Sequence, residues 1–389
     1  MKGRTGLRAA LTALCSLATP LHAQSFADID RAVAQGIERG IYPGAVVVVG
    51  RSDSIIYARG YGHFTWSRAS QVPRPDSTLW DIASITKVVG TASAAMRLVD
   101  AGRLDLDAPV RRYLPKFSGG LKDQVTVRML LDHTSGLRSY APLFKRARSR
   151  AAAIELLYTE RPTRRPGDLP VYSDLNAMFL GLVVEAIARM PLDRFVTMEV
   201  FDPLGLEQTT YHPSPAMRRR AVPTALWRGH PIQGQVNDPN AAILGGAAGH
   251  AGIFSTGMDL ARYAQVWLRS GAGPHGQWVS ATTIRRFLTR GPNSGPRLLG
   301  WDTPELNLPE PSLFGTLISD AAYGHTGFTG TELLIDPTRN LFLVFLTNRT
   351  FDPRARDSHH GLRNVRVELS DAAVRLVPHA CQQELVAQC

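Results

Sequence analysis

Ser84 and Lys87 stand three residues apart in a largely apolar segment of isoleucine, alanine and valine. In a helix this spacing places both side chains on one face. A serine hydroxyl is a poor nucleophile at neutral pH and needs an adjacent base, and a lysine serves as that base when an apolar setting destabilises its ammonium. The pair therefore predicts nucleophilic attack by Ser84 with Lys87 as the base. The plain alternative is a helix start with an incidental lysine.

Lysine is scarce in this chain. The sequence contains five lysines, at positions 2, 87, 116, 122 and 145, so 39 of its 44 basic residues are arginine. Arginine is not deprotonated in proteins, so a position that must exchange a proton requires lysine. Lys87 is also the one lysine that follows a serine by three residues. This usage favours a chemical role for Lys87.

A second polar segment, Val171-Tyr-Ser-Asp-Leu-Asn176, precedes an apolar pattern typical of a helix over residues 175–187. A phenol beside an ammonium has a lowered pKa and relays protons between a serine and a leaving group. Tyr172 is the candidate for this role. The alternative is a packing tyrosine, with Ser173 or Asp174 capping the helix.

A third segment, Tyr323-Gly-His-Thr-Gly-Phe-Thr-Gly330, runs into a predicted strand. Its glycines permit close approach of a ligand to the backbone, and an edge strand presents unpaired N–H groups to an acyl substrate or its oxyanion. The alternative is a glycine-rich hairpin entry in which His325 satisfies a neighbouring carbonyl.

Together the three segments resemble the serine β-lactamase and penicillin-binding protein superfamily, specifically its class C-like branch of carboxypeptidases and esterases. The pattern of that family is Ser-x-x-Lys, then Tyr-x-Asn, then Lys-Thr-Gly or His-Thr-Gly. This chain has Ser84-Ile-Thr-Lys87, Tyr172-Ser-Asp174 and His325-Thr-Gly327, separated by 88 and 153 residues. Residues 130–137, 245–256, 259–262 and 299–302 are similar to the same branch, so the resemblance covers nearly all of the chain.

The resemblance implies a covalent acyl-enzyme on Ser84, formed with Lys87 and Tyr172. The backbone N–H groups of Ser84 and Phe328 would bind the oxyanion. The substrate side of the cleft would be lined by Asp174, His325, Thr326, Gly327 and Phe328.

Two positions depart from the family pattern. Asp174 replaces an amide donor by a carboxylate that only accepts hydrogen bonds, so it either contacts the substrate or holds Lys87 by an ion pair. His325 stands where β-lactamases usually have lysine. A fixed positive charge for a substrate carboxylate is then missing unless a nearby arginine provides it. This disfavours β-lactamase as the main activity.

The resemblance thus implies an esterase or a serine-type D-Ala-D-Ala carboxypeptidase acting on a small molecule or a cell-wall peptide. The alternatives are a β-lactamase, a penicillin-binding sensor that is acylated without turnover, and an inactive scaffold. Neither a cofactor nor a metal is expected, because the histidines at 133, 250, 359 and 360 lack metal-ligand spacing. His133 and His250 are expected as structural caps or pocket walls.

The elements that position these residues indicate an α+β fold. Strand hairpins are expected over residues 45–58 and 331–346, and they predict one antiparallel sheet built from both ends of the chain. A mainly helical lobe, roughly residues 90–270, is expected as an insertion in the α/β lobe. Helices are predicted over residues 28–39, 84–101, 175–187, 260–268 and 362–376.

The first 23 residues have the layout of a secretory signal peptide, with a basic start, an apolar run over residues 9–21 and a small-residue finish at Ala23. Cleavage after Ala23 would leave residues 24–389 as one hydrolase domain in the periplasm or secreted. A buried N-terminal helix is the alternative. Leu14 before Cys15 disfavours a lipid anchor, and no later stretch approaches the roughly 18 apolar residues of a membrane span.

The chain is basic, with a formal net charge of +11 that falls to +8 without the three basic residues of the leader, Lys2, Arg4 and Arg8. The basic residues are spread along the sequence, which favours a solvated surface over a nucleic-acid site; weak attraction to anionic envelope polymers is the alternative. Cys381 and Cys389 either form a disulfide or remain free thiols. The oligomeric state is open.

Overall fold

A five-stranded antiparallel sheet with the strand order β2-β1-β11-β10-β9 forms the centre of the computed structural model, which describes residues 19–304, 312–352, 354–355 and 357–377. The first predicted hairpin is β1 (Gly44–Gly50) with β2 (Ile55–Gly62), and the second is β10 (Glu332–Asp336) with β11 (Leu341–Thr347). β9 (Tyr323–Thr326) is the far edge strand. Since β1 pairs with β11, the two ends of the chain share one sheet, and the α+β prediction is confirmed.

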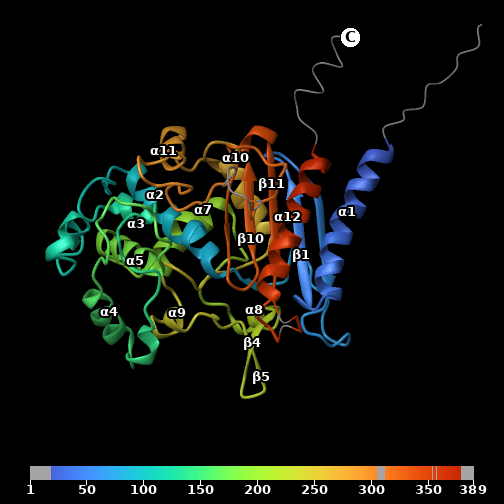
Figure 1. Cartoon of the computed structure of the whole chain (residues 1–389), viewed down its shortest axis with the longest axis horizontal. Coiled ribbons are helices and arrows are strands. Elements are labelled where there is room, and N and C mark those ends of the chain that lie inside the picture. The colour runs from blue at the N-terminus through green and yellow to red at the C-terminus, as the bar shows by residue number, and fades with distance from the viewer. Residues whose placement is uncertain (1–18, 305–311, 353, 356, 378–389) are drawn as a thin grey trace, which may run out of the picture.

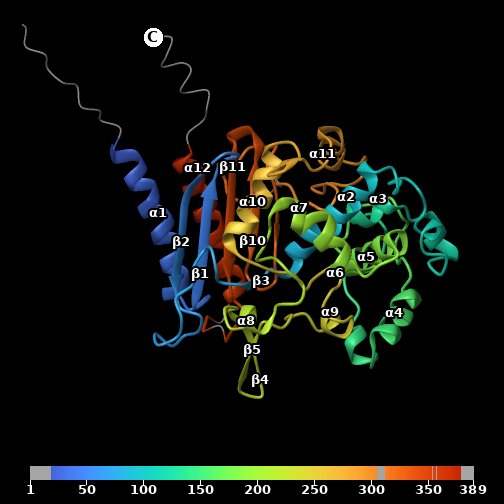
Figure 2. The ribbon, with the colours of Figure 1, turned by 180° about the vertical axis from the view of Figure 1, so that it is seen from behind.

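Helices cover both faces of the sheet. α1 (Thr19–Glu38) and α12 (Ser358–Leu376) pack against each other on one face, and α10 (Gly257–Leu268) lies on the other (Figures 1 and 2). Because both faces are covered, β1 is buried along its whole length and consists of valine, alanine and glycine without polar alternation. The predicted helical insertion includes α10, which the structure places on the sheet.

Most of the remaining helices form a second part of the molecule beside the sheet, whereas α8 (Pro215–Arg218) lies below the sheet next to β4 (Pro223–Trp227) (Figure 1). At the centre of this second part α2 (Ser93–Asp100) and α3 (Val127–Leu131) pack against α5 (Asp174–Ala188). The single helix predicted over residues 84–101 is wrong in detail. It is divided into a 3-10 turn at Ala83–Ile85, a π-helical segment at Lys87–Ala92 and α2.

Shorter elements complete the two parts. β3 pairs with β6, β4 with β5 and β7 with β8. The bounds are α4 (Arg150–Thr159), α6 (Leu192–Val196), α7 (Asp202–Leu204), α8 (Pro215–Arg218), α9 (Pro239–Ile243), α11 (Ala281–Phe287), β3 (Trp80–Asp81), β4 (Pro223–Trp227), β5 (His230–Gln233), β6 (Phe254–Ser255), β7 (Ala272–Gly273) and β8 (Gly276–Gln277), with 3-10 turns at Val110–Arg112, Gly120–Gln124, Leu143–Lys145 and Pro337–Arg339 and a π-helical segment at Thr197–Phe201.

Two predictions from the ends of the sequence fall mainly outside the described residues. Residues 1–18 of the predicted leader are not among them, and the expected cleavage point after Ala23 lies within α1. Cys381 and Cys389 also lie outside the described residues, so their pairing stays a prediction. Among the described residues no single helix has the length and hydropathy of a membrane span. The two helical segments Asp174–Ala188 and Leu192–Leu204, which are bent against each other by 76°, have that length and hydropathy only as a pair.

Candidate active site

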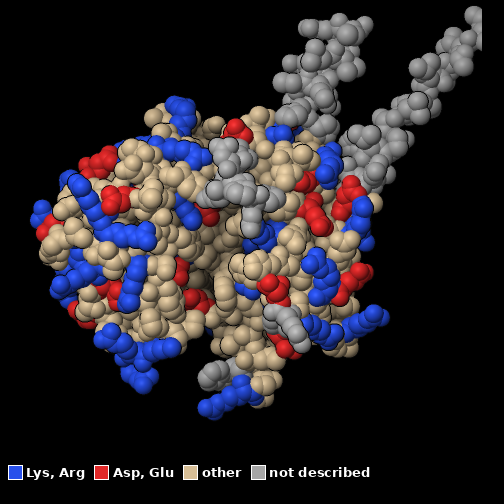
Figure 3. Space-filling view, viewed as in Figure 1, with Lys and Arg blue, Asp and Glu red and all other residues tan. Residues whose placement is uncertain are grey.

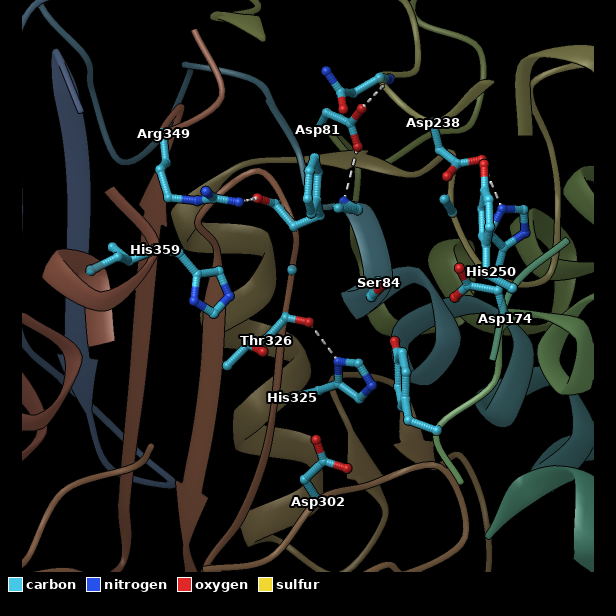
Figure 4. Close-up of a pocket in the computed structure, with 18 of the residues that line it drawn as sticks. Asp81, Ser84, Asp174, Asp238, His250, Asp302, His325, Thr326, Arg349 and His359 are labelled. Atoms are coloured by element: carbon cyan, nitrogen blue, oxygen red, sulfur yellow. Dashed lines mark hydrogen bonds and ion pairs between the residues drawn. The ribbon is translucent and has the colours of Figure 1, made fainter. Parts of the chain in front are cut away.

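The three predicted motifs meet in one cleft of about 640 Å³. Figure 3 shows a hollow between the helical part and the sheet part, on a face where Lys and Arg are scattered rather than gathered into one patch. Figure 4 shows Ser84 in the cleft, with His325 and Thr326 on the strand side and Asp174 and His250 on the helical side. The predicted site residues that line the cleft are Ser84, Tyr172, Asp174, His325, Thr326, Gly327 and Phe328.

Lys87 is buried beneath the cleft and contacts three acceptors. Its Nζ lies 2.9 Å from Ser84 Oγ, 2.7 Å from Asp174 Oδ1 and 3.2 Å from the His250 carbonyl oxygen. The 3-10 turn followed by the π-helical segment keeps Ser84 and Lys87 on one side of the backbone, as the three-residue spacing predicted. The expected contact is confirmed, and the catalytic roles of both residues stay predictions.

The ion pair with Asp174 determines the charge of Lys87. Burial alone would lower the pKa of Lys87, but Tyr172 and the Asp174 carboxylate outweigh burial and raise the pKa above its usual value. The expectation of an amine made neutral by its apolar setting is therefore wrong for the resting site. Of the two roles considered for Asp174, the structure has the ion pair, while Ser173 provides the helix cap by accepting the Asn176 N–H.

Tyr172, the third predicted catalytic residue, lies next to Lys87. Lys87 Nζ lies 4.9 Å from the centre of the Tyr172 ring, and the electrostatic interactions of the phenol are with Lys87, Asp174 and Ser84. The ring also packs against His133 and His325, at 4.8 and 5.9 Å between ring centres. Burial raises the pKa of the Tyr172 phenol, and this effect exceeds the lowering by the Lys87 charge, so the predicted lowering of that pKa is wrong.

The turn before Ser84 is strained and anchored. Ala83 has a φ of +46°, in the left-handed region that favours glycine. Its N–H donates to Asp81 Oδ1 at 2.9 Å, and the other oxygen of Asp81 accepts the Asn237 N–H at 2.7 Å. Burial raises the pKa of Asp81 to about 6. Asp81 was missed by the sequence analysis; its one signal is an acid in an otherwise apolar segment.

His325 extends from β9 into the cleft as a neutral ring. Its Nδ1 lies 2.8 Å from the Thr326 carbonyl oxygen, which fits the plain alternative of a histidine that satisfies a neighbouring carbonyl. Burial, together with the nearby cations Lys87 and Arg297, lowers the pKa of His325 to about 4, although Asp302 opposes the shift. The fixed positive charge of a lysine is thus missing at this position, as predicted.

Gly327 and Phe328 follow β9 in the chain, and Gly327 packs closely against the residues that precede Ser84. A Cβ on Gly327 would lie 2.1 Å from Thr331 Oγ1 and 2.6 Å from the Ile82 carbonyl oxygen, so glycine is required for this close approach. No acceptor for the Phe328 N–H lies within the described residues, which leaves this donor available to an oxyanion. The Phe328 ring itself is 66% exposed at the cleft.

The expectation that His133 and His250 are structural caps or pocket walls is confirmed. His250 lines the cleft, with its Nε2 2.9 Å from Asp238 Oδ1. His133 lies behind Tyr172, and its Nδ1 accepts the Ser173 N–H at 3.1 Å. Within the described part of the chain, no group of three or more His, Cys, Asp and Glu side chains is placed to hold a metal ion.

Three arginines in the cleft were missed because no local motif marks them. Arg297 forms an ion pair with Asp302, and Arg366 lies 3.6 Å from Glu332 and donates to the Thr331 carbonyl. Arg349 donates to the Phe328 carbonyl and has no carboxylate within ion-pair distance among the described residues. Within the described parts of the chain, Arg349 is therefore the cleft arginine that remains for an anionic group of a ligand.

Comparisons with known proteins identify the family and the fold of this chain. A family model described as Beta-lactamase matches residues 29–366. The chain is 34% identical over 362 residues to "N-acetylmuramyl-L-alanine amidase" of Bacillus subtilis strain 168, covering 83% of this chain and 81% of the relative. It is 30% identical over 361 residues to "Putative D-alanyl-D-alanine carboxypeptidase" of Escherichia coli strain K12, covering 84% and 83%. A solved class C beta lactamase superposes with a TM-score of 0.70 at 18% identity, over 91% of this chain and 99% of that one.

Proposed function

Because the chain belongs to the beta-lactamase family, we propose that it is a serine hydrolase that forms an acyl-enzyme on Ser84 and cleaves a D-alanyl-type peptide amide. The observation that carries the proposal is the 2.9 Å contact between Ser84 Oγ and Lys87 Nζ at the floor of a cleft that also holds Tyr172. The Ser84 nucleophile has the Lys87 amine within hydrogen-bond distance and the Tyr172 phenol beside that amine. Acyl transfer requires such a nucleophile with adjacent proton-transfer groups.

The reaction has two halves. Ser84 Oγ bonds to the substrate carbonyl carbon as its proton moves to Lys87 Nζ while Lys87 passes a different proton on to a hydrogen-bonded neighbour, and the carbonyl oxygen becomes an oxyanion. The bond to the leaving group then breaks as that group takes a proton from the pair of Lys87 and Tyr172, which leaves the acyl group on Ser84. Water attacks the acyl carbon in the second half and releases the acid.

The oxyanion is assigned to the backbone N–H groups of Ser84 and Phe328. Support comes from the Phe328 N–H, for which no acceptor lies within the described residues. One such donor typically contributes about 10²- to 10³-fold to the rate. The positive charge of Lys87 adds to the stabilisation of the oxyanion, because the cation lies directly beneath Ser84.

A peptide with a free C-terminal carboxylate suits the charge of the cleft. Two of its three arginines face acidic side chains, whereas Arg349 has none within the described residues and lies beside Phe328, whose N–H is assigned to the oxyanion. An arginine binds a carboxylate through parallel N–H donors. The carboxypeptidase and amidase names of the two curated relatives support a cell-wall peptide as the substrate class.

Ester hydrolysis is the second candidate function. Three apolar or aromatic side chains are exposed at the cleft, namely Tyr140, Leu313 and Phe328, at 41%, 38% and 66%. Such a rim suits the apolar acyl or alcohol part of an ester. A β-lactamase is less favoured because His325 is neutral, so the strand lacks the fixed cation of a lysine.

Hydrolysis assays with three substrates test the proposal. The wild-type chain is expected to turn over a D-alanyl-D-alanine peptide faster than an aryl ester or penicillin, and S84A is expected to abolish all turnover. A faster ester reaction would favour the second candidate. One burst of product without turnover would indicate an acylated sensor, and S84A turnover equal to wild type would contradict the nucleophile assignment.

Replacing Arg349 tests the substrate class. R349Q is expected to raise KM for the free D-alanyl-D-alanine peptide by about tenfold or more, because a charge-assisted hydrogen bond is lost. The same peptide with an amidated C-terminus is the matched control and should show no change in KM. Equal effects on both peptides would contradict carboxylate binding by Arg349.

We also propose that the protein is exported to the periplasm or secreted. The basic start, apolar run and small-residue finish of the first 23 residues support this location. Cell fractionation with N-terminal sequencing is expected to find a mature chain that begins at Gln24. An intact N-terminus in the cytoplasmic fraction would contradict the proposal.

A further inference from the structure

The contacts of Lys87 leave the resting site without a free base. An ammonium has three N–H donors and no lone pair, and Lys87 Nζ lies within hydrogen-bond distance of three oxygens, those of Ser84, Asp174 and the His250 carbonyl. Asp174 and Tyr172 also raise the pKa of Lys87. Tyr172 is a neutral phenol, since burial raises its pKa. The proton of Ser84 therefore needs another final acceptor.

Asp174 is the negative charge in direct contact with this lysine. Its Oδ1 lies 2.7 Å from Lys87 Nζ, and its side chain is 20% exposed to solvent, against 4% for that of Lys87. Its N–H donates to the Ser139 carbonyl at 2.9 Å, which fixes the backbone at the first residue of α5. A carboxylate at the start of this 15-residue helix is also favoured by the helix dipole. The three side chains form a continuous chain of hydrogen bonds from Ser84 through Lys87 to Asp174.

We propose that Asp174 receives the serine proton through Lys87. This inference rests on the proposed function and deepens it. As Ser84 Oγ bonds to the substrate carbonyl carbon, its proton moves to Lys87 Nζ while Lys87 gives a different proton to Asp174. The carbonyl π electrons move onto the oxygen.

Charge balances in this step. A cation and a carboxylate become a cation, a neutral acid and an oxyanion, so the total is zero before and after. Lys87 keeps its positive charge beside the oxyanion throughout. Asp174 returns the proton by the same route when the leaving group departs. Asp174 is thus a positioning residue that acts through Lys87 by setting its protonation.

Other titratable groups near the pair do not account for proton transfer near neutral pH. Burial lowers the pKa of His133 well below its usual value and that of His325 to about 4, so both rings are neutral. Burial also raises the pKa of the Tyr140 phenol, and the carboxylates of Asp238 and Asp174 add to this rise.

Two further pairs of charged or titratable side chains lie near the cleft. Asp238 faces His250 at 2.9 Å, and the pKa of Asp238 is lowered because this contact outweighs its burial. Arg297 lies over the Tyr172 ring, 5.1 Å from its centre, and is paired with Asp302. The pair of Lys87 and Asp174 is then the group whose protonation controls the attack.

The pH dependence of D174N tests the inference. In this isosteric variant Ser84 is activated only when Lys87 has lost its proton. The rate of covalent labelling of Ser84 by a fluorophosphonate is expected to fall about 10²-fold or more at pH 6, because the proton acceptor is lost while Lys87 is still an ammonium, and to recover toward pH 10 as Lys87 loses its proton. NMR of ¹⁵N-labelled lysine should show the pKa of Lys87 about 1 to 3 units lower than in the wild type.

Two control variants separate this role from a structural one. D174E keeps a carboxylate and is expected to keep the shape of the wild-type pH profile. D238N removes an equal charge from the same cleft and should produce no deficit that recovers at high pH. A D174N deficit that is constant from pH 6 to 10, or no deficit, would overturn the inference. Failure to label wild-type Ser84 at all would instead contradict the proposed function.

Discussion

Lys87 and Lys122 are two buried lysines with opposite electrostatic surroundings. Each residue is 4% exposed. Lys87 contacts the Asp174 carboxylate, and its pKa is raised, whereas Lys122 donates to the Tyr158 carbonyl and burial lowers its pKa, with Arg161 adding to the effect. The same degree of burial thus gives two directions of shift. The partner of the amine, and not its burial, decides the direction in which the pKa of these two lysines shifts.

Replacement of each lysine by methionine gives the largest expected contrast. K87M removes the proton-transfer group and should lower kcat/KM by about 10²- to 10⁴-fold. K122M removes a buried amine that does not line the cleft, so kcat/KM should stay within about twofold of the wild-type value. Steady-state assays with the best substrate measure both. Equal losses in the two variants would break the distinction between a catalytic and a structural lysine.

Removing the Tyr172 hydroxyl makes the two lysine sites more alike. Lys122 Nζ lies 5.3 Å from the ring centre of Phe117, and Lys87 Nζ lies 4.9 Å from that of Tyr172, so the hydroxyl is the main difference between the two rings. Y172F is expected to lower kcat/KM by about 10²-fold, because proton transfer to the leaving group is impaired. Y158F is the matched control and should keep full activity. A Y172F rate equal to wild type would exclude the phenol from proton transfer.

Asp81 extends the comparison to acids. Asp81 and Asp174 both line the cleft, but the Asp81 carboxylate is held by backbone N–H groups of Ala83 and Asn237 rather than by a cation. Burial raises its pKa from 3.8 to about 6, so the folded protein binds this proton more tightly than the unfolded chain. This contribution to stability is complete below pH 4 and is lost as pH rises through 6.

An asparagine at position 81 does not titrate. The free energy of unfolding of D81N minus that of the wild type should therefore increase by about 2 kcal/mol between pH 4 and pH 7, slightly less than the full equivalent of the pKa shift. Urea unfolding at both pH values measures this difference. A difference that is the same at both pH values would mean that Asp81 has an ordinary pKa in the folded state.

The smallest expected effect, on stability, concerns the backbone turns that precede the two lysines. The turn before Lys122 has glycines at its positive-φ positions, Gly119 and Gly120, whereas the turn before Lys87 has Ala83 at a φ of +46°. A83G relieves the strain of a left-handed alanine but adds freedom to the unfolded chain, so the net stabilisation should be up to about 1 kcal/mol. Urea unfolding checks this value. Destabilisation by more than about 1 kcal/mol would show that Ala83 is not strained.

Much of the fold could be predicted because its signals are local. The β-branched runs and polar turns of the two hairpins specify antiparallel neighbours without reference to the rest of the chain. The break of the predicted helix over residues 84–101 could not be predicted, since a π-helical segment and an α-helix differ by one residue per hydrogen bond and share the same apolar pattern.

The candidate site, like the fold, has features that the sequence predicted and features that it did not. The contact of Ser84 with Lys87 follows from a spacing of three residues, and the motif order predicted the residues of the cleft. The charge of Lys87 could not be predicted, because it depends on Asp174 at the start of a distant helix. Arg349, two residues after the end of β11, belongs to no local motif. Its place in the cleft becomes evident only from the folded structure.

The central claim is that Ser84, activated through Lys87, carries the acyl group. Trapping the acyl-enzyme by acid quench and mapping the added mass after proteolysis tests it most directly. The account predicts the acyl mass on the peptide that contains Ser84, and no adduct in S84A. An acyl group mapped to any other residue, or retained in S84A, would contradict the account.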